Sequence, residues 1–187
     1  MIISTPKSVL AYYTNPTVEN AVDLVLGRKQ KPVPADLPWT DLPGYYRAMA
    51  AARQLQFDYT GLLWEIWQAT WPGVSLPSGA KQQPLDGVDP PKVWDCGYMG
   101  TSVKVGAFTL ERLIYLDGET GAQIGIGLWA GSKRWLGKKD FPVDWEKGDE
   151  CIWSPPGEVP LEPAIRVDKL REFATDAMRL CRERVEP

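Results

Sequence analysis

The apolar residues change their spacing about halfway along this chain. Between residues 16 and 71 they recur every three or four positions, which is the repeat of an amphipathic helix. Between residues 98 and 130 they alternate or form short apolar runs, as they do in β-strands. Helices followed by consecutive strands indicate an α+β fold with an antiparallel meander in the second half.

Two helices are predicted in the first part. Asn15 followed by Pro16 is a typical helix start, and Gly27 ends that helix. A longer helical pattern begins near residue 41 or 44 and stops at Pro72-Gly73, with Thr60-Gly61 as a point where it could divide. Its apolar stripe consists of Ala48, Ala52, Leu55, Tyr59, Leu62, Ile66 and Ala69.

Three strands are predicted at residues 98–108, 110–116 and 122–130, with a hairpin turn between the last two. A short strand is expected at residues 151–153. The chain closes with an amphipathic helix from about Asp168, which we expect to pack on the sheet. Its apolar stripe is Leu170, Phe173, Ala174, Ala177, Leu180 and Cys181.

Proline-rich segments at about residues 30–44 and 72–92 predict surface loops. The segment before the first loop is too short to bury a core of its own. We therefore expect a single α+β domain over residues 1–187.

Charge and cysteine usage limit the possible partners and the compartment. The net charge is −3 with both signs interspersed, so nucleic acid is not expected as a partner. Three cysteines without CxxC spacing predict free thiols in a reducing compartment. No window approaches the roughly 20 apolar residues that cross a bilayer, and no signal peptide precedes the first helix. We expect a cytoplasmic protein without membrane contact.

The chain contains no histidine. This excludes imidazole-based triads, HExxH zinc sites and imidazole general bases within the chain. No nucleotide or metal motif is present either, so we expect no cofactor and no metal site. A catalyst here would need carboxylates, Lys, Tyr, Cys or an oxygen-bound Mg²⁺.

Four carboxylates are the candidates for such chemistry: Asp117, Glu119, Asp140 and Asp144. They would suit a hydrolase, with or without Mg²⁺, that acts on a sugar or a phosphate substrate. However, Asp117 and Glu119 belong to a hairpin turn, and the acids of residues 140–150 fit a solvated loop. An enzyme is therefore the alternative interpretation.

Glycines and tryptophans supply a second alternative. Gly121, Gly125, Gly127 and Gly131 do not match a phosphate-binding loop, and glycines within a strand more often allow a neighbouring element to approach closely. Aromatic rings nearby could stack on a small molecule or a carbohydrate. The candidates are Trp129, Trp135, Trp145 and Trp153.

The long helix carries Trp64, Trp67 and Trp71 at spacings of three and four, on the side opposite its main apolar stripe. Either the helix is buried on both sides, which is the more common arrangement, or this ridge binds a partner, as Trp often does at interfaces. With no motif for catalysis, we expect a non-catalytic protein-binding protein that uses an aromatic surface. Inhibitor, immunity and adaptor proteins, including those of phages and other mobile elements, fit this profile.

Overall fold

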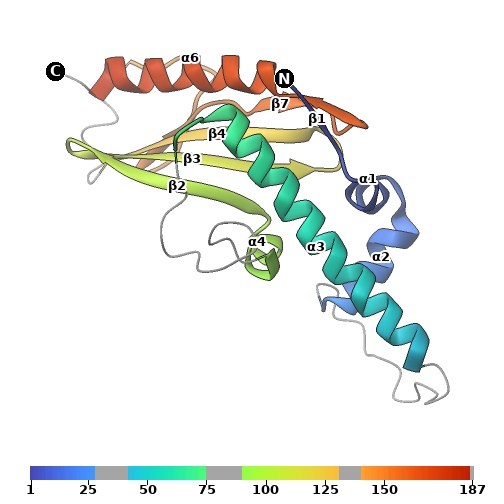
Figure 1. Cartoon of the computed structure of the whole chain (residues 1–187). Helices are drawn as coiled ribbons and strands as arrows, with labels where there is room; N and C mark the ends of the chain where they lie inside the picture. Colours follow the sequence, from blue (N-terminus) through green and yellow to red (C-terminus); the bar gives the residue numbers. More distant parts are fainter. Residues whose placement is uncertain (28–41, 75–89, 131–139, 186–187) are drawn as a thin grey trace.

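The computed structural model describes residues 1–27, 42–74, 90–130 and 140–185. Helices come first, an antiparallel sheet follows, and a C-terminal helix covers the sheet (Figure 1). The predicted α+β class is confirmed. Most of both proline-rich segments, and residues 131–139, lie outside the described residues.

The N-terminal helices are α1 (Lys7–Thr14), α2 (Pro16–Val25) and α3 (Leu42–Thr70). Asn15 caps α2 as predicted, because its side-chain oxygen accepts hydrogen bonds from the backbone amides of Thr17, at 3.0 Å, and Val18, at 3.4 Å. The long helix runs unbroken through Thr60 and Gly61. No helix within the described residues has the length and apolarity that a membrane span needs.

The main sheet contains the predicted meander. Its strand order is β2-β3-β4-β6-β5, and β7 also pairs with β4. The strands are β2 (Tyr98–Val105), β3 (Phe108–Asp117), β4 (Gly121–Ala130), β5 (Glu146–Lys147), β6 (Cys151–Trp153) and β7 (Gly157–Val159). A separate antiparallel pair, β1 (Ile2–Ser4) with β8 (Ala164–Arg166), joins the N-terminal segment to the strand that precedes the last helix.

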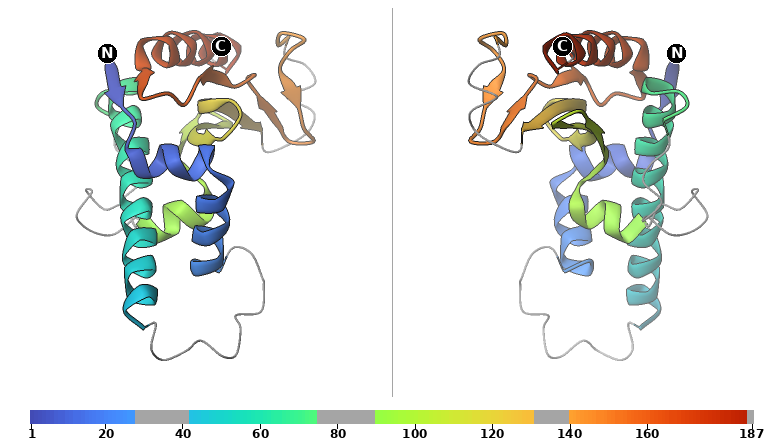
Figure 2. Two further views of the ribbon diagram at one scale, coloured as in Figure 1. Left: turned by 90° about the vertical axis from the view of Figure 1, so that its right-hand side faces the viewer. Right: turned by 90° about the vertical axis from the view of Figure 1, so that its left-hand side faces the viewer.

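The closing helix α6 (Val167–Val185) lies across one face of the sheet (Figures 1 and 2). Its predicted stripe faces the core: Leu170, Ala174, Ala177 and Cys181 are buried. Phe173 packs over Gly157 of β7, where an added Cβ would come within 2.4 Å of the ring. Burial of a large apolar side chain stabilises a fold by about 1.5–3 kcal/mol, so this stripe holds the helix on the sheet.

Helix α3 is covered on more than one side, which explains its two apolar faces. It contacts α1, α2 and the short helix α4 (Pro90–Cys96), and also α6, β2 and β3. Trp94 of α4 meets Tyr12 and Tyr59 edge to face, with ring centroids 5.0 and 5.1 Å apart. The helix therefore links the helical part to the sheet, and it runs along one side of the molecule (Figure 2).

Candidate functional site

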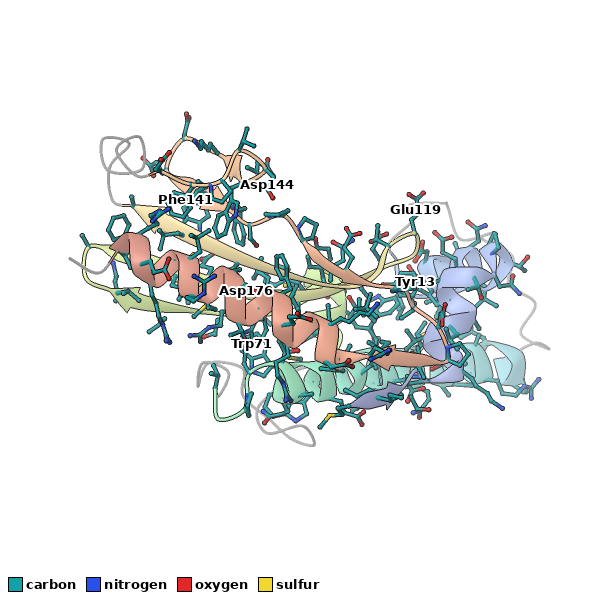
Figure 3. The ribbon with its side chains drawn as sticks, turned by 90° about the horizontal axis from the view of Figure 1, so that it is seen from above. Tyr13, Trp71, Glu119, Phe141, Asp144 and Asp176 are labelled. Atoms are coloured by element: carbon teal, nitrogen blue, oxygen red, sulfur yellow. The ribbon has the colours of Figure 1, made fainter. Side chains whose placement is uncertain are left out.

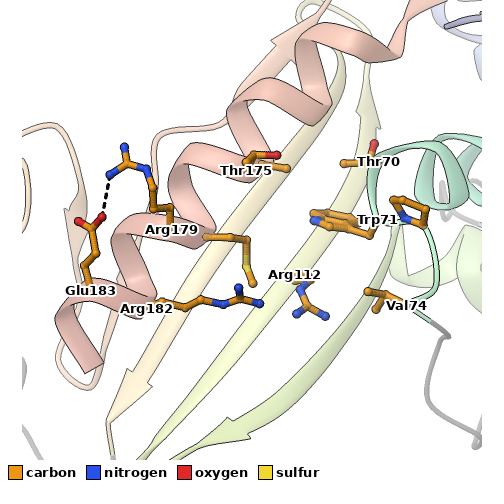
Figure 4. A pocket seen from close by; sticks show the side chains of 11 residues that line it. Thr70, Trp71, Val74, Arg112, Thr175, Arg179, Arg182 and Glu183 are labelled. Atoms are coloured by element: carbon orange, nitrogen blue, oxygen red, sulfur yellow. Dashed lines mark hydrogen bonds and ion pairs between the residues drawn. The ribbon is translucent and has the colours of Figure 1, made fainter. Parts of the chain in front are cut away.

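A pocket of about 520 Å³ opens between α6, the C-terminal end of α3 and strand β3 (Figure 4). This size is within the range of ligand-binding pockets. Three arginines and one tryptophan contribute to its wall. The lining residues are Thr70, Trp71, Pro72, Val74, Arg112, Ala174, Thr175, Met178, Arg179, Arg182 and Glu183.

Two interactions fix the end of α3 against the pocket. Arg171 of α6 donates hydrogen bonds from Nε, at 2.8 Å, and from a terminal nitrogen to the carbonyl of Ala69. The indole nitrogen of Trp67 donates to the carbonyl of Val74 at 2.9 Å. It thereby holds the turn after the helix, in which Gly73 adopts a positive φ of 80°. The turn and the helix end thus form a rigid wall that carries Trp71.

Arg112 occupies an unusual place in the sheet. Every second residue of β3 faces α6, and Arg112 belongs to this series. The other residues of the series are buried apolar side chains: Phe108, Leu110, Ile114 and Leu116. Directly opposite Arg112 on β4 stands Ile126. A guanidinium therefore emerges from an otherwise apolar face. Burial, and then the positive charge of Arg182, lower the pKa of Arg112 below its ordinary value.

Helix α6 supplies the other cations. Arg179 is already paired, with Glu183 at 2.8 Å and with Asp176 at 3.7 Å. Arg182 and Arg112, by contrast, form no ion pair with any side chain in the described ranges. Figure 4 shows the guanidinium of Arg182 extending across the pocket towards Arg112. Two positive charges therefore stand close together without a carboxylate.

Several polar atoms of the wall lack hydrogen-bond partners. Arg112 Nε, Trp71 Nε1 and Thr70 Oγ1 are buried, and none has an acceptor or donor among the described residues. Guanidinium and indole N–H groups can only donate. An unpaired buried donor costs about 1–3 kcal/mol, and a cluster of such donors in a native fold calls for an explanation. These atoms lie behind the accessible surface of the pocket, so a ligand does not bond to them directly, but the dipoles of the two N–H donors favour negative charge in the pocket.

The three tryptophans of the predicted ridge differ in burial. Trp67 is fully buried and Trp71 is 7% exposed, and both belong to the core. Trp64 is half-buried and packs against the same core. Trp71 alone among the three lines the pocket.

The four candidate carboxylates do not come together. Asp117 Oδ1 accepts hydrogen bonds from the backbone amides of Thr120, at 3.0 Å, and Glu119, at 2.8 Å, and these bonds lower the pKa of the Asp117 carboxyl. Glu119 is exposed at that turn, and Asp144 is exposed near the β5–β6 hairpin, well apart from Glu119 (Figure 3). Asp144 and Trp71 lie on opposite sides of α6 in the same view. Asp140 is also exposed. No group of three or more acids and thiols within the described ranges is placed to hold a metal ion.

The candidate stacking residues also separate. Trp153 lies on Gly125 and Gly127, as expected for strand glycines that allow close approach, and it meets Trp129 edge to face at 6.4 Å. Both indoles are on the sheet face opposite Arg112. Arg112 pairs with Ile126, and side chains alternate between the two faces along a strand, so Trp129 of β4 and Trp153, which pairs with Gly127, point the other way. Trp145 is buried against Phe141. Trp135 lies outside the described residues.

Sequence reasoning missed Arg112, Arg179 and Arg182 as pocket residues. One signal was present: Arg112 is the only charged residue in the alternating series from residue 108 to residue 116. A charge at an inward position of a strand is costly and therefore informative. The α6 arginines carry no comparable signal, because arginines on the polar face of a helix are ordinary.

Comparison with known proteins gives no relative: no family model matches the chain, and no curated protein or solved structure matches it significantly.

Proposed function

We propose that this chain is a non-catalytic binding protein that engages a protein partner, and that the pocket between α3 and α6 receives an anionic group of that partner. The observation that carries this proposal is the pair Arg112 and Arg182, two neighbouring guanidiniums without a carboxylate. Arginine forms forked, charge-assisted hydrogen bonds with anionic groups, so such a pair suits an acidic ligand.

The chemistry of the wall supports binding rather than catalysis. Among the described residues of the wall, the one acid is Glu183, and its carboxylate is paired with Arg179 at 2.8 Å rather than free to act as a general base. The carboxylates that a hydrolase would need stand at separate turns and loops. Arg and Trp are also the residue types that contribute most at protein interfaces.

The other face of the sheet supports a second candidate function. Trp129 is 37% exposed and stands edge to face with the half-buried Trp153. Such a pair could stack on a carbohydrate or another flat small molecule. Substitution of Trp129 separates this candidate from the first one, since the two sites are on opposite faces.

Affinity capture with three baits tests the proposal: the full chain, its Arg182→Gln variant and its Trp129→Ala variant. Arg182 is exposed at the pocket, so its substitution should leave the fold intact, which a thermal melt of each bait checks. The partner should bind the full chain and Trp129→Ala, and should be lost from Arg182→Gln. Equal capture by Arg182→Gln would overturn the pocket as the binding site.

The same partner should then be purified and titrated against the full chain at rising salt. Binding that depends on two exposed or half-buried cations should weaken as the Debye length shortens from about 10 Å at 0.1 M salt to about 3 Å at 1 M. Affinity independent of salt would contradict an anionic group in the pocket.

A further inference from the structure

We infer that the anionic group is a phosphate monoester in its doubly charged form, carried in a protein partner by a phosphorylated side chain. This inference rests on the proposed anion-binding role of the pocket and specifies its chemistry. It is carried by the charge balance of the wall, by the donor-only polar atoms and by the size of the cavity.

Charge balance favours a dianion. The charged lining residues that the structure describes are three arginines and Glu183, and Glu183 pairs with Arg179 at 2.8 Å, which leaves the two positive charges of Arg112 and Arg182. Asp176, which approaches Arg179 at 3.7 Å, does not line the pocket. A carboxylate would balance only one of these two positive charges. A phosphate monoester carries about −1.5 to −2 charges at pH 7 and three acceptor oxygens, so it can satisfy both guanidiniums at once.

The polar atoms of the wall favour a ligand with several acceptors. The terminal nitrogens of Arg112 and Arg182 can contact the ligand directly. Behind them, Arg112 Nε and Trp71 Nε1 are buried donors without partners, and their dipoles favour negative charge in the cavity. An amine would meet the two unpaired guanidiniums, and the Glu183 carboxylate of the wall is already paired with Arg179.

The cavity is larger than a phosphate group. Beside the arginines, part of its wall is apolar and is formed by Trp71, Val74, Ala174 and Met178. This part can accommodate the carbon atoms that carry the phosphate. The pocket is therefore suited to an organic phosphate ester more than to inorganic phosphate.

The charged groups in the described wall of the pocket are guanidiniums and one carboxylate. The charged residues that face the cavity are Arg112 from β3 and Arg179, Arg182 and Glu183 from α6, and the chain has no histidine. Guanidiniums and carboxylates in general keep their charge between about pH 6 and 8. A phosphate monoester, in contrast, loses its second proton near pH 6, where the monoanion becomes the dianion. A pH dependence of binding around pH 6 therefore belongs to the ligand.

Calorimetric titration of the full chain with phenyl phosphate and with benzenesulfonate tests the inference, because the two probes share a ring but differ in charge. At pH 7.5 and low salt, phenyl phosphate should bind about tenfold more tightly or better, owing to its second charge. This advantage should shrink several-fold at pH 5.5, while the affinity for benzenesulfonate stays constant. Inorganic phosphate should bind more weakly than phenyl phosphate.

Variants localise the effect. Arg182→Gln should remove the preference for phenyl phosphate, whereas Lys104→Gln should retain it. Lys104 is an exposed cation of β2 whose side chain is on the opposite face of the sheet from Arg112. An equal loss in both variants would show that only the general positive charge of the protein matters, and would overturn the inference.

The remaining outcomes separate this inference from the proposed function. If both probes bind with equal affinity and both depend on Arg182, the pocket binds anions but does not select a dianion. If neither probe binds at millimolar concentration, the anion-binding role itself fails. A matched pair of peptides with and without a phosphoserine identifies the source. Binding of phenyl phosphate with exclusion of the phosphopeptide would overturn the protein partner in favour of a small phosphate ester.

Discussion

Trp67 and Trp71 lie ring against ring, with centroids 4.6 Å apart, but only the indole nitrogen of Trp67 has an acceptor. The Trp67 nitrogen holds the carbonyl of Val74 and so fixes the turn that follows α3. The Trp71 nitrogen points into the wall of the pocket without a partner. One indole nitrogen thus stabilises the fold, whereas its neighbour is a buried donor without an acceptor behind the surface of the pocket.

This difference predicts different costs for two equal substitutions. Trp67→Phe should lower the free energy of unfolding by about 1–3 kcal/mol, because it leaves the Val74 carbonyl unpaired and opens a void in the core. Trp71→Phe should cost at least about 1 kcal/mol less, since it removes a donor that has no acceptor. Urea unfolding of both variants measures the difference. Equal losses would show that the hydrogen bond to Val74 contributes little.

Replacement of Arg112 by an uncharged residue is expected to increase the free energy of unfolding. Its half-buried charge is not compensated within the described part of the chain, and Met would replace the aliphatic stem with an uncharged side chain of similar length. Arg112→Met should raise the free energy of unfolding by about 1 kcal/mol while it abolishes anion binding, as expected when a functional group opposes stability.

Arg166→Met is the matched control. Arg166 is exposed and pairs with Asp168 at 2.7 Å, and fully exposed pairs of this kind contribute little to stability. This variant should therefore change little. A loss of stability in Arg112→Met larger than that of the control would indicate that Arg112 supports the fold rather than a ligand.

The elements that the sequence predicted are those with local signals. The dipeptide Asn15-Pro16 marks a helix start by itself. The apolar stripes of α3 and α6 and the alternation in β2 to β4 repeat over enough residues to be recognised without the structure. Strands β1 and β8 have three residues each and pair across more than 150 positions, so no local pattern marks them. Helix α4 lies partly within a segment whose prolines predicted a loop.

The pocket was harder to predict, because its wall comes from three separate stretches of the chain. Residues 70–74, residue 112 and residues 174–183 meet only after α3 and α6 have packed against the sheet. The two-faced pattern of α3 was visible, but whether its tryptophans face a partner or the core depends on which elements cover it. That information is in the tertiary packing and not in the helix itself.

The glycines of β4 predict a second matched pair. A Cβ at position 127 would lie 2.7 Å from the ring of Trp153, whereas at position 125 the nearest ring atom is 3.8 Å away. Gly127→Ala should destabilise the protein by about 1–3 kcal/mol through overpacking. Gly125→Ala should cost less than about 1 kcal/mol, since an ordinary contact forms and the unfolded chain loses freedom. Similar melting temperatures for the two variants would mean that Trp153 moves away easily.

The three cysteines are unpaired and differ in exposure: Cys96 is exposed, Cys151 is half-buried and Cys181 is buried. Burial raises the pKa of Cys181 from an ordinary value of 9.0 to about 12. The thiolate is the reactive form, so a thiol reagent at pH 8 should modify Cys96 quickly and Cys181 only as fast as the protein unfolds. Rapid modification of Cys181 in the native protein would contradict its buried position.

The same shift in pKa predicts an alkaline loss of stability. The folded protein keeps the Cys181 proton up to about pH 12, whereas the unfolded chain releases it near pH 9.0. The contribution of this thiol to the free energy of unfolding is therefore complete below pH 9.0 and is lost as the pH rises towards 12. Between about pH 8 and 10.5 the free energy of unfolding should fall by about 1–2 kcal/mol more in the parent chain than in Cys181→Ala. Cys96→Ala should follow the parent, because this thiol is exposed in the folded protein. Parallel pH profiles for the parent and Cys181→Ala, measured by urea unfolding, would show that Cys181 is not buried as a neutral thiol.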